Sequence, residues 1–234
     1  MHQSARALPL PLSIPFLSEV PANVVMDEDT IGGMERVRRC AGQVVALAIL
    51  AMISPLMLVL AWIIRRDGGP ATFEHYRVGC GGRVFKCLKF RTMRLDAERV
   101  LREMLQRNPV LLAEWRRDQK LAHDPRVTRF GRWLRRSSLD ELPQLFNVLR
   151  GEMALVGPRP ITVAELQRYG AARWHYLSVP PGITGLWQVS GRNRLAYSRR
   201  VELDRLYVER SSVWLDCQIL AKTLVVVLTR DGAC

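Results

Sequence analysis

The sequence lacks the short motifs that mark several common enzyme classes. It has no P-loop, no GxGxxG turn, no GxSxG elbow and no HExxH pair. P-loop nucleotide hydrolases, dinucleotide-binding folds, α/β-hydrolases and zinc peptidases are therefore not indicated. The four histidines also lack metal-ligand spacing; they are His2, His75, His123 and His175.

Cysteine is scarce and scattered along the chain. The five cysteines stand at positions 40, 80, 87, 217 and 234, and no two of them have CxxC spacing. Zinc sites and dithiol redox motifs need closer spacing than this. An odd, scattered set indicates reduced thiols in a protein that faces the cytosol.

Acidic residues are few relative to basic ones. The chain has 22 Asp and Glu against 35 Lys and Arg, which gives a formal net charge of +13. This imbalance indicates an anionic partner, which would be a nucleic acid, an acidic membrane surface or a phosphorylated substrate.

Residues 41–64 contain no charged side chain. As a helix they would extend about 36 Å, enough to cross a hydrocarbon core of about 30 Å. Three arginines precede the stretch and two follow it, so the positive-inside rule gives no preferred direction. The segment lies too far from the start, and is too long, for a signal peptide.

Ser54 and Pro55 fall near the middle of this apolar stretch. Proline removes one backbone hydrogen bond and bends a helix, and a serine hydroxyl can satisfy part of the freed backbone. The pattern predicts either a kinked spanning helix or a re-entrant helix that bends and returns to the same face of the bilayer.

The remaining chain predicts an α+β fold that is mostly helical. Residues 1–33 are rich in proline without periodicity, so we expect a disordered cytoplasmic tail before the membrane helix of 34–66. In the domain of 67–234, two strand-like runs, 71–78 and 83–93, flank a glycine-rich turn and predict a small β-hairpin. Helices are expected over 95–107, 110–120, 195–207 and 213–229, and a short strand over 153–156. The last helix is expected to pack on the core or to lie in the membrane interface.

Two adjacent acids, Asp140 and Glu141, stand in a segment dense in arginine. Acids among arginines suit a site that handles phosphate and a metal ion, because arginine binds phosphate oxygens in pairs and carboxylates bind hard cations. Ser138 and Glu141 also match a capping box, which would make both acids part of an ordinary helix start.

Several basic residues are placed to bind an anion. Period two along the second strand puts Lys89 and Arg91 on one face, where they would grip a phosphate or form a solvated basic face. Arg159 stands between two prolines, and Arg192 follows a glycine, Gly191. Around Trp133, a helix with arginines on its other side suits a membrane surface, or it packs on the hairpin.

Five motifs in this order resemble those of the bacterial sugar transferases, the monotopic polyprenyl-phosphate phosphoglycosyl transferases. The motifs are KFRTM at 89–93, DPRVT at 124–128, SLDELPQ at 138–144, VGPRP at 156–160 and PGITGL at 181–186. The resemblance runs from about residue 34 to the C-terminus and is nearest to the ExoY-type undecaprenyl-phosphate galactose phosphotransferases of exopolysaccharide synthesis. The family's re-entrant membrane helix breaks at a Ser-Pro pair. The Ser54-Pro55 pair therefore favours the re-entrant helix over the kinked spanning helix.

The resemblance implies a reaction and a set of residue roles. Such enzymes transfer a sugar phosphate from a UDP-sugar to undecaprenyl phosphate and release UMP, at the cytoplasmic face of the bacterial inner membrane. Asp140 would be the nucleophile of a covalent aspartyl-phosphosugar intermediate, and Glu141 would bind Mg²⁺. Gln144 would orient the site. The phosphate-binding residues would be Lys89, Arg135, Arg159 and Arg192.

The same resemblance sets expectations about partners. Downstream glycosyltransferases would use the lipid product, and the sugar would be galactose, with glucose or an N-acetylated sugar as alternatives. Larger members carry extra membrane helices and a further domain, so we expect this chain to be the minimal catalytic unit. The apolar stretch and the paired acids argue against a nucleic-acid partner. A non-catalytic scaffold of a polysaccharide complex is the remaining rival.

Overall fold

The computed structural model describes residues 33–118, 121 and 124–229, so the tail expected over 1–33 lies outside it apart from Gly33. The described chain is mostly helical and contains two small two-stranded sheets, which confirms the α+β prediction. The strands are β1 (Thr72–Val78), β2 (Val84–Phe90), β3 (Ala154–Val156) and β4 (Gly182–Thr184). The helices are α1 (Gly33–Arg65), α2 (Ala97–Arg107), α3 (Pro109–Asp118), α4 (Arg129–Arg136), α5 (Gln144–Leu149), α6 (Val163–Gln167), α7 (Arg173–Leu177), α8 (Leu186–Val189), α9 (Tyr197–Glu209) and α10 (Val213–Thr229).

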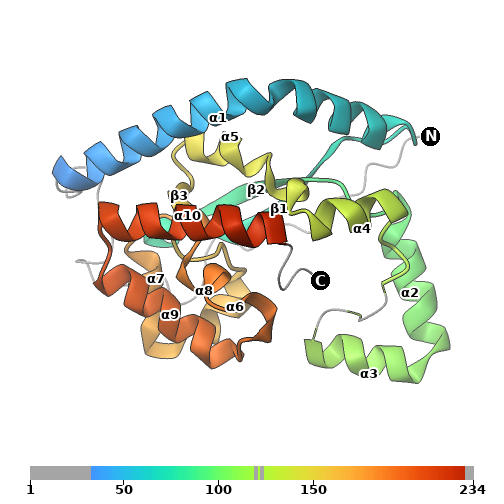
Figure 1. Ribbon diagram of the computed structural model, residues 1–234. Helices are drawn as coiled ribbons and strands as arrows, with labels where there is room; N and C mark the ends of the chain where they lie inside the picture. Colours follow the sequence, from blue (N-terminus) through green and yellow to red (C-terminus); the bar gives the residue numbers. More distant parts are fainter. Residues whose placement is uncertain (1–32, 119–120, 122–123, 230–234) are drawn as a thin grey trace.

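Helix α1 is the apolar stretch that the sequence singled out. It is long and apolar enough to cross a membrane by length and composition. Pro55 lies inside it, and the helix is a single bent rod rather than two antiparallel arms (Figure 1). The Ser54 hydroxyl donates to the carbonyl of Ala51 at 2.9 Å, the carbonyl that Pro55 leaves without its amide partner. The predicted role of this serine is confirmed.

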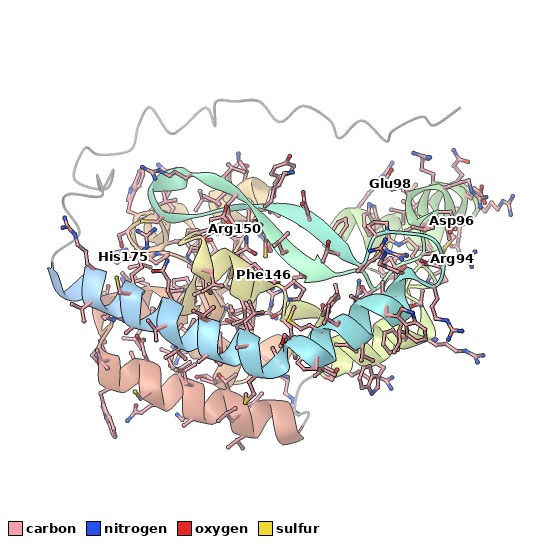
Figure 2. The ribbon with its side chains drawn as sticks, turned by 90° about the horizontal axis from the view of Figure 1, so that it is seen from above. Arg94, Asp96, Glu98, Phe146, Arg150 and His175 are labelled. Carbon is pink, nitrogen blue, oxygen red and sulfur yellow. The ribbon has the colours of Figure 1, made fainter. Side chains whose placement is uncertain are left out.

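One side of α1 packs on the domain along most of its length. Ala46 packs with the hairpin and α5, and Leu60 packs with α4. Near the start of α1, Arg38 pairs with Asp216 at 2.6 Å, and at its end the carbonyl of Ile64 accepts from a domain arginine. Seen from above, α1 crosses the domain between the hairpin and α10 (Figure 2). Its other side exposes large apolar residues, which include Val44, Leu47, Met52, Leu58 and Trp62.

The β-hairpin formed as predicted, with β1 antiparallel to β2 around a glycine-rich turn. Helix α5 is fixed to β2 by Asn147, which is fully buried. Its side chain accepts from the amide of Leu88 at 3.0 Å and donates to the carbonyl of Lys86 at 2.8 Å. Because this side-chain amide replaces a missing strand partner for β2, α5 is held against the free edge of β2.

Strands β3 and β4 form a parallel pair that the sequence analysis did not predict. The strand expected over 153–156 is β3, but the sequence analysis assigned no strand to its partner residues. Gly157 and Gly182 allow the two backbones to approach: a Cβ on Gly182 would lie 2.1 Å from the amide of Gly157. The pair ends directly before the Pro-Arg-Pro turn, which it therefore holds in place.

Helices α2 and α3 project away from the rest of the domain, and α2 buries none of its residues (Figure 1). Helix α10 spans the residues predicted for it. It buries Ile219 against α8 and β3 while leaving Trp214 and Leu224 exposed. The first part of the prediction for this helix, packing on the core, is confirmed; an interfacial position stays a prediction.

Candidate active site

The two acids lie on a single turn of 3-10 helix, η4 (Leu139–Glu141), between α4 and α5. The capping box expected from Ser138 did not form. Ser138 has a positive φ of 57° and makes no side-chain cap. This left-handed residue ends α4 sharply, so the chain reverses and turns both acids toward β2 instead of continuing one long helix.

Glu141 lies against Lys89 from β2. The Lys89 ammonium donates to Glu141 at 2.6 Å, and the Arg159 guanidinium lies 4.0 Å from the same carboxylate. Burial alone would raise the pKa of Glu141, but the charges of Lys89, Arg159 and, further off, Arg192 hold that pKa below its usual value. Glu141 is therefore ionised throughout the neutral range.

Asp140 has the opposite electrostatic character although it is the next residue. Asp140 is only 9% exposed. Burial raises the pKa of Asp140, and the charge of Glu141 raises it further, while Lys89 and Arg135 oppose the rise. Two neighbouring carboxyls with opposite pKa shifts are the usual sign of two different chemical tasks.

Arg135 is positioned by the contact between α4 and the end of β2. Its Nε donates to the hydroxyl of Thr92 at 2.9 Å. The close approach depends on Gly131, because a Cβ there would lie 2.0 Å from the carbonyl of Thr92. Gly131 thus allows α4 to pack closely enough to bring Arg135 near Asp140.

Arg159 and Arg192 reach the site from the C-terminal half of the chain. Arg159 follows the β3–β4 pair and lies over the ring of Trp187, 5.9 Å from its centroid. Arg192 has a positive φ of 50° directly after Gly191, and its charge acts on Glu141. Both predicted cations therefore act on Glu141, one of the two acids that the sequence analysis placed in the site.

Arg91 is not part of this group, which corrects the expectation that it shares a phosphate with Lys89. It follows β2 and turns to the end of α1. Its guanidinium pairs with Asp67 and donates to the carbonyls of Ile64 and Pro70. Period two holds only inside a strand, and Arg91 lies one residue beyond the last one of β2.

Gln144 is buried to 1% exposure, and its side-chain oxygen has no hydrogen-bond partner among the described residues. It lines a small pocket together with Glu141, Lys89 and Arg159. A buried acceptor without a donor is costly, so an oxygen in this state is available to a ligand.

The same pocket includes two residues that the sequence analysis missed, Arg77 and Gln188. Arg77 comes from β1 and pairs with Glu165 at 3.1 Å. Gln188 donates to the carbonyl of Ile183, and its oxygen has no partner among the described residues. Nothing local in the sequence marks either residue, because Arg77 reaches the pocket through the β1–β2 hairpin and Gln188 through the parallel pairing of β3 and β4, which brings α8 to Glu141.

These observations define a class of protein: an α+β domain carried on a long apolar helix, with a buried Asp140 beside a partly buried Glu141 and cations from both halves of the chain around them. The bacterial sugar transferase model matches residues 34–230, so the chain belongs to that family.

Three curated relatives illustrate the similarity. The UDP-galactose-lipid carrier transferase of Erwinia amylovora is 53% identical over 80% of this chain and 39% of its own length. The undecaprenyl-phosphate galactose phosphotransferase of Salmonella typhimurium is 48% identical over 98% of this chain and 49% of its own length. The exopolysaccharide production protein ExoY of Sinorhizobium fredii is 46% identical over 87% of this chain and 89% of its own length. The chain thus spans half or less of the first two relatives and most of the third.

Proposed function

We propose that this protein transfers a sugar 1-phosphate from a UDP-sugar to undecaprenyl phosphate and releases UMP, as the initiating step of exopolysaccharide synthesis. The observation that carries the proposal is the acid pair: a buried Asp140 with a raised pKa beside a Glu141 that Lys89 keeps ionised. The cations around it match the charge of a diphosphate.

Asp140 is the nucleophile in this proposal. An oxygen of its carboxylate attacks the phosphorus next to the sugar, the bond from that phosphorus to the bridging oxygen breaks, and UMP leaves with the electron pair. In the second step an oxygen of the lipid phosphate attacks the same phosphorus and frees Asp140. Arg135 and Arg159 lie where they can hold the phosphate oxygens during both steps.

The residues present fit a magnesium ion. Mg²⁺ prefers oxygen ligands, takes few of them from the protein and binds substrate phosphates with the rest. Glu141 and the unpartnered oxygen of Gln144 supply such ligands in one pocket. When bound there, the ion would neutralise the diphosphate charge. No group of three or more His, Cys, Asp or Glu suitable for a metal occurs among the described residues, so a site built from protein side chains alone is not indicated.

We propose a position at the cytoplasmic face of the inner membrane, and helix α1 supports a seat on one side of a bilayer. Both of its ends contact the same domain, Arg38 through Asp216 and Ile64 through Arg91. A domain on one side of a bilayer cannot hold both ends of a helix that crosses it. The helix therefore suits a shallow, re-entrant seat with its exposed apolar side in lipid, at the depth of the lipid phosphate.

Galactose is the sugar we propose. The relatives at 53% and 48% identity are named for galactose, and the relative in Xanthomonas campestris named for glucose is 39% identical. The test is UMP release by the purified full chain with undecaprenyl phosphate, Mg²⁺ and a panel of UDP-sugars. UMP release from UDP-galactose alone supports the assignment. Release from UDP-glucose instead would change the sugar, and no release from any UDP-sugar would favour a non-catalytic scaffold.

A further inference from the structure

The outer face of α4 forms a second basic surface, separate from the acids. Arg129, Arg132 and Arg136 line a surface pocket around the exposed ring of Trp133. The three arginines follow the spacing i, i+3 and i+7, so they form one stripe along the helix. Arg135, which serves the acids, lies beside Thr92 on the inner side.

This stripe carries its charge without acidic partners. Among the described residues, no carboxylate forms an ion pair with Arg129, Arg132 or Arg136. Two exposed arginines of α9 are paired in contrast: Arg199 with Glu202 and Arg205 with Glu209. Like charges at three- and four-residue spacing repel one another in an isolated helix, so an anion from outside the chain would relieve the repulsion.

The opposite side of α4 fixes the stripe next to α1. Leu134 is fully buried there and packs with Leu60 and Ile64 of α1. The end of α1 repeats the chemistry of the stripe, because the guanidinium of Arg66 lies over the exposed ring of Trp62. Tryptophan and arginine side by side at the edge of an apolar surface are typical of the headgroup layer of a membrane.

We propose that the stripe of Arg129, Arg132 and Arg136, with Trp133, binds the phosphate headgroup of an anionic phospholipid. Each guanidinium offers paired donors to phosphate oxygens, and the Trp133 ring lies at the boundary between headgroups and acyl chains. The choice of a lipid over a soluble anion follows from the position against the apolar α1 and from the exposed indole. The inference relies on the membrane seat of α1 and not on the transfer reaction.

The test uses the full chain in mixed micelles doped with phosphatidylglycerol. Binding is measured by titration and by native mass spectrometry of retained lipid. The triple variant R129Q/R132Q/R136Q should bind phosphatidylglycerol about 10- to 100-fold more weakly than the wild type, since each basic residue near an anionic surface contributes several-fold. The single variant W133Q should show a smaller loss and serves as a second readout should the triple variant fail to fold.

The matched control is R199Q/R205Q/R210Q, which removes the same charge from α9 and its C-cap residue Arg210, on the side of the domain away from α1 (Figure 1). It should bind phosphatidylglycerol as the wild type does. An equal loss in both triple variants would overturn the proposal, because net charge alone would then explain binding. Equal affinity for phosphatidylcholine, or displacement of the lipid by millimolar inorganic phosphate, would also overturn it. UMP release by the wild type, measured alongside, reports separately on the transfer reaction.

Discussion

Lys89 and Arg91 lie two residues apart in one motif, yet they serve two different regions of the molecule. Lys89, inside β2, donates to Glu141 in the small pocket that both residues line. Arg91, just past the strand, binds Asp67 and the carbonyl that ends α1. Around the acids, the charged side chains face a pocket. At the junction between α1 and the domain, formed by Asp67 and Arg91, the charged side chain instead binds backbone carbonyls and holds the end of the helix. Equal chemistry in a motif does not imply equal function.

The largest effect should come from removing the nucleophile in the site region. Asp140→Asn should lower the rate of UMP release by on the order of 10³-fold or more, since an amide cannot form the phosphosugar ester. Mass spectrometry of the wild type, given UDP-galactose without lipid, should show a sugar phosphate on the peptide with Asp140. Asp67→Asn is the matched control at the junction and should keep its rate per folded molecule. An active Asp140→Asn with an inactive Glu141→Gln would reverse the assigned roles.

Lys89→Met should lower turnover by about 10²-fold, because the site loses a cation that faces both acids. The loss should appear in the rate of UMP release, while the melting temperature in detergent changes little, since Glu141 remains near Arg159. Turnover close to the wild type would place Lys89 with Arg91 as a structural residue and remove the contrast between the two regions.

Arg91→Met should do the reverse. Its side chain is 9% exposed and holds Asp67 and several backbone carbonyls, so its loss should cost about 2 kcal/mol of stability. The melting temperature should fall by roughly 4–8 °C while turnover per folded molecule stays within about twofold. A large loss of turnover without a change in melting temperature would show that Arg91 acts in the active site and not as a structural residue.

The acid limb of the pH–rate profile tests whether Lys89 and Glu141 shift the pKa of Asp140 in opposite directions. The reactive form of Asp140 is the carboxylate, and its pKa lies above the ordinary 3.8, so the rate of phosphosugar formation should fall as pH falls through that raised pKa. Lys89 lowers the pKa of Asp140 and Glu141 raises it. The limb should therefore move to higher pH in Lys89→Met and to lower pH in Glu141→Gln. Movement in the same direction in both variants would contradict the arrangement.

The junction has its own pH dependence. Arg91 lowers the pKa of Asp67 to about 2. A depressed carboxyl pKa contributes stability above its unfolded value, and this contribution is lost as pH falls toward 2. Arg91→Met should flatten the fall in melting temperature over that range.

The smallest effect should come from Lys86→Gln on the same strand. Lys86 pairs with Glu74 at 2.8 Å, but both side chains are about half exposed. Exposed pairs contribute little, so neither the melting temperature nor turnover should change measurably. A clear change in turnover would show that any charge on β2 affects the site, and Lys89 would lose its special position.

The sequence predicted what depends on local pattern. The hairpin and α10 came from periodicity, whereas the grouping of Asp140 and Glu141 with Lys89, Arg135, Arg159 and Arg192 came from the resemblance to the sugar transferases. The prediction that Arg91 shares a phosphate with Lys89 was wrong, because it extended the period-two pattern of the strand past its last residue.

What depends on distant pairing could not be predicted. Strands β3 and β4 are three residues each and lie far apart in the chain, so no local pattern reveals that they pair. Gln188 reaches the pocket only through that pairing. Ser138 matches a helix-start motif, but it adopts a positive φ and forms no cap. Tertiary packing outweighs the local cap here, so the direction of the two acids could not be predicted from the motif.

Helix α1 is both a membrane seat and a wall of the core, since Ala46, Met57 and Leu60 are buried against the hairpin, α5 and α4. A truncation that removes the helix to make a water-soluble fragment would strip the cover from two hydrophobic clusters. Such a fragment should aggregate. Solubilisation of the whole chain should require an amphiphile that replaces lipid and leaves α1 packed on the domain.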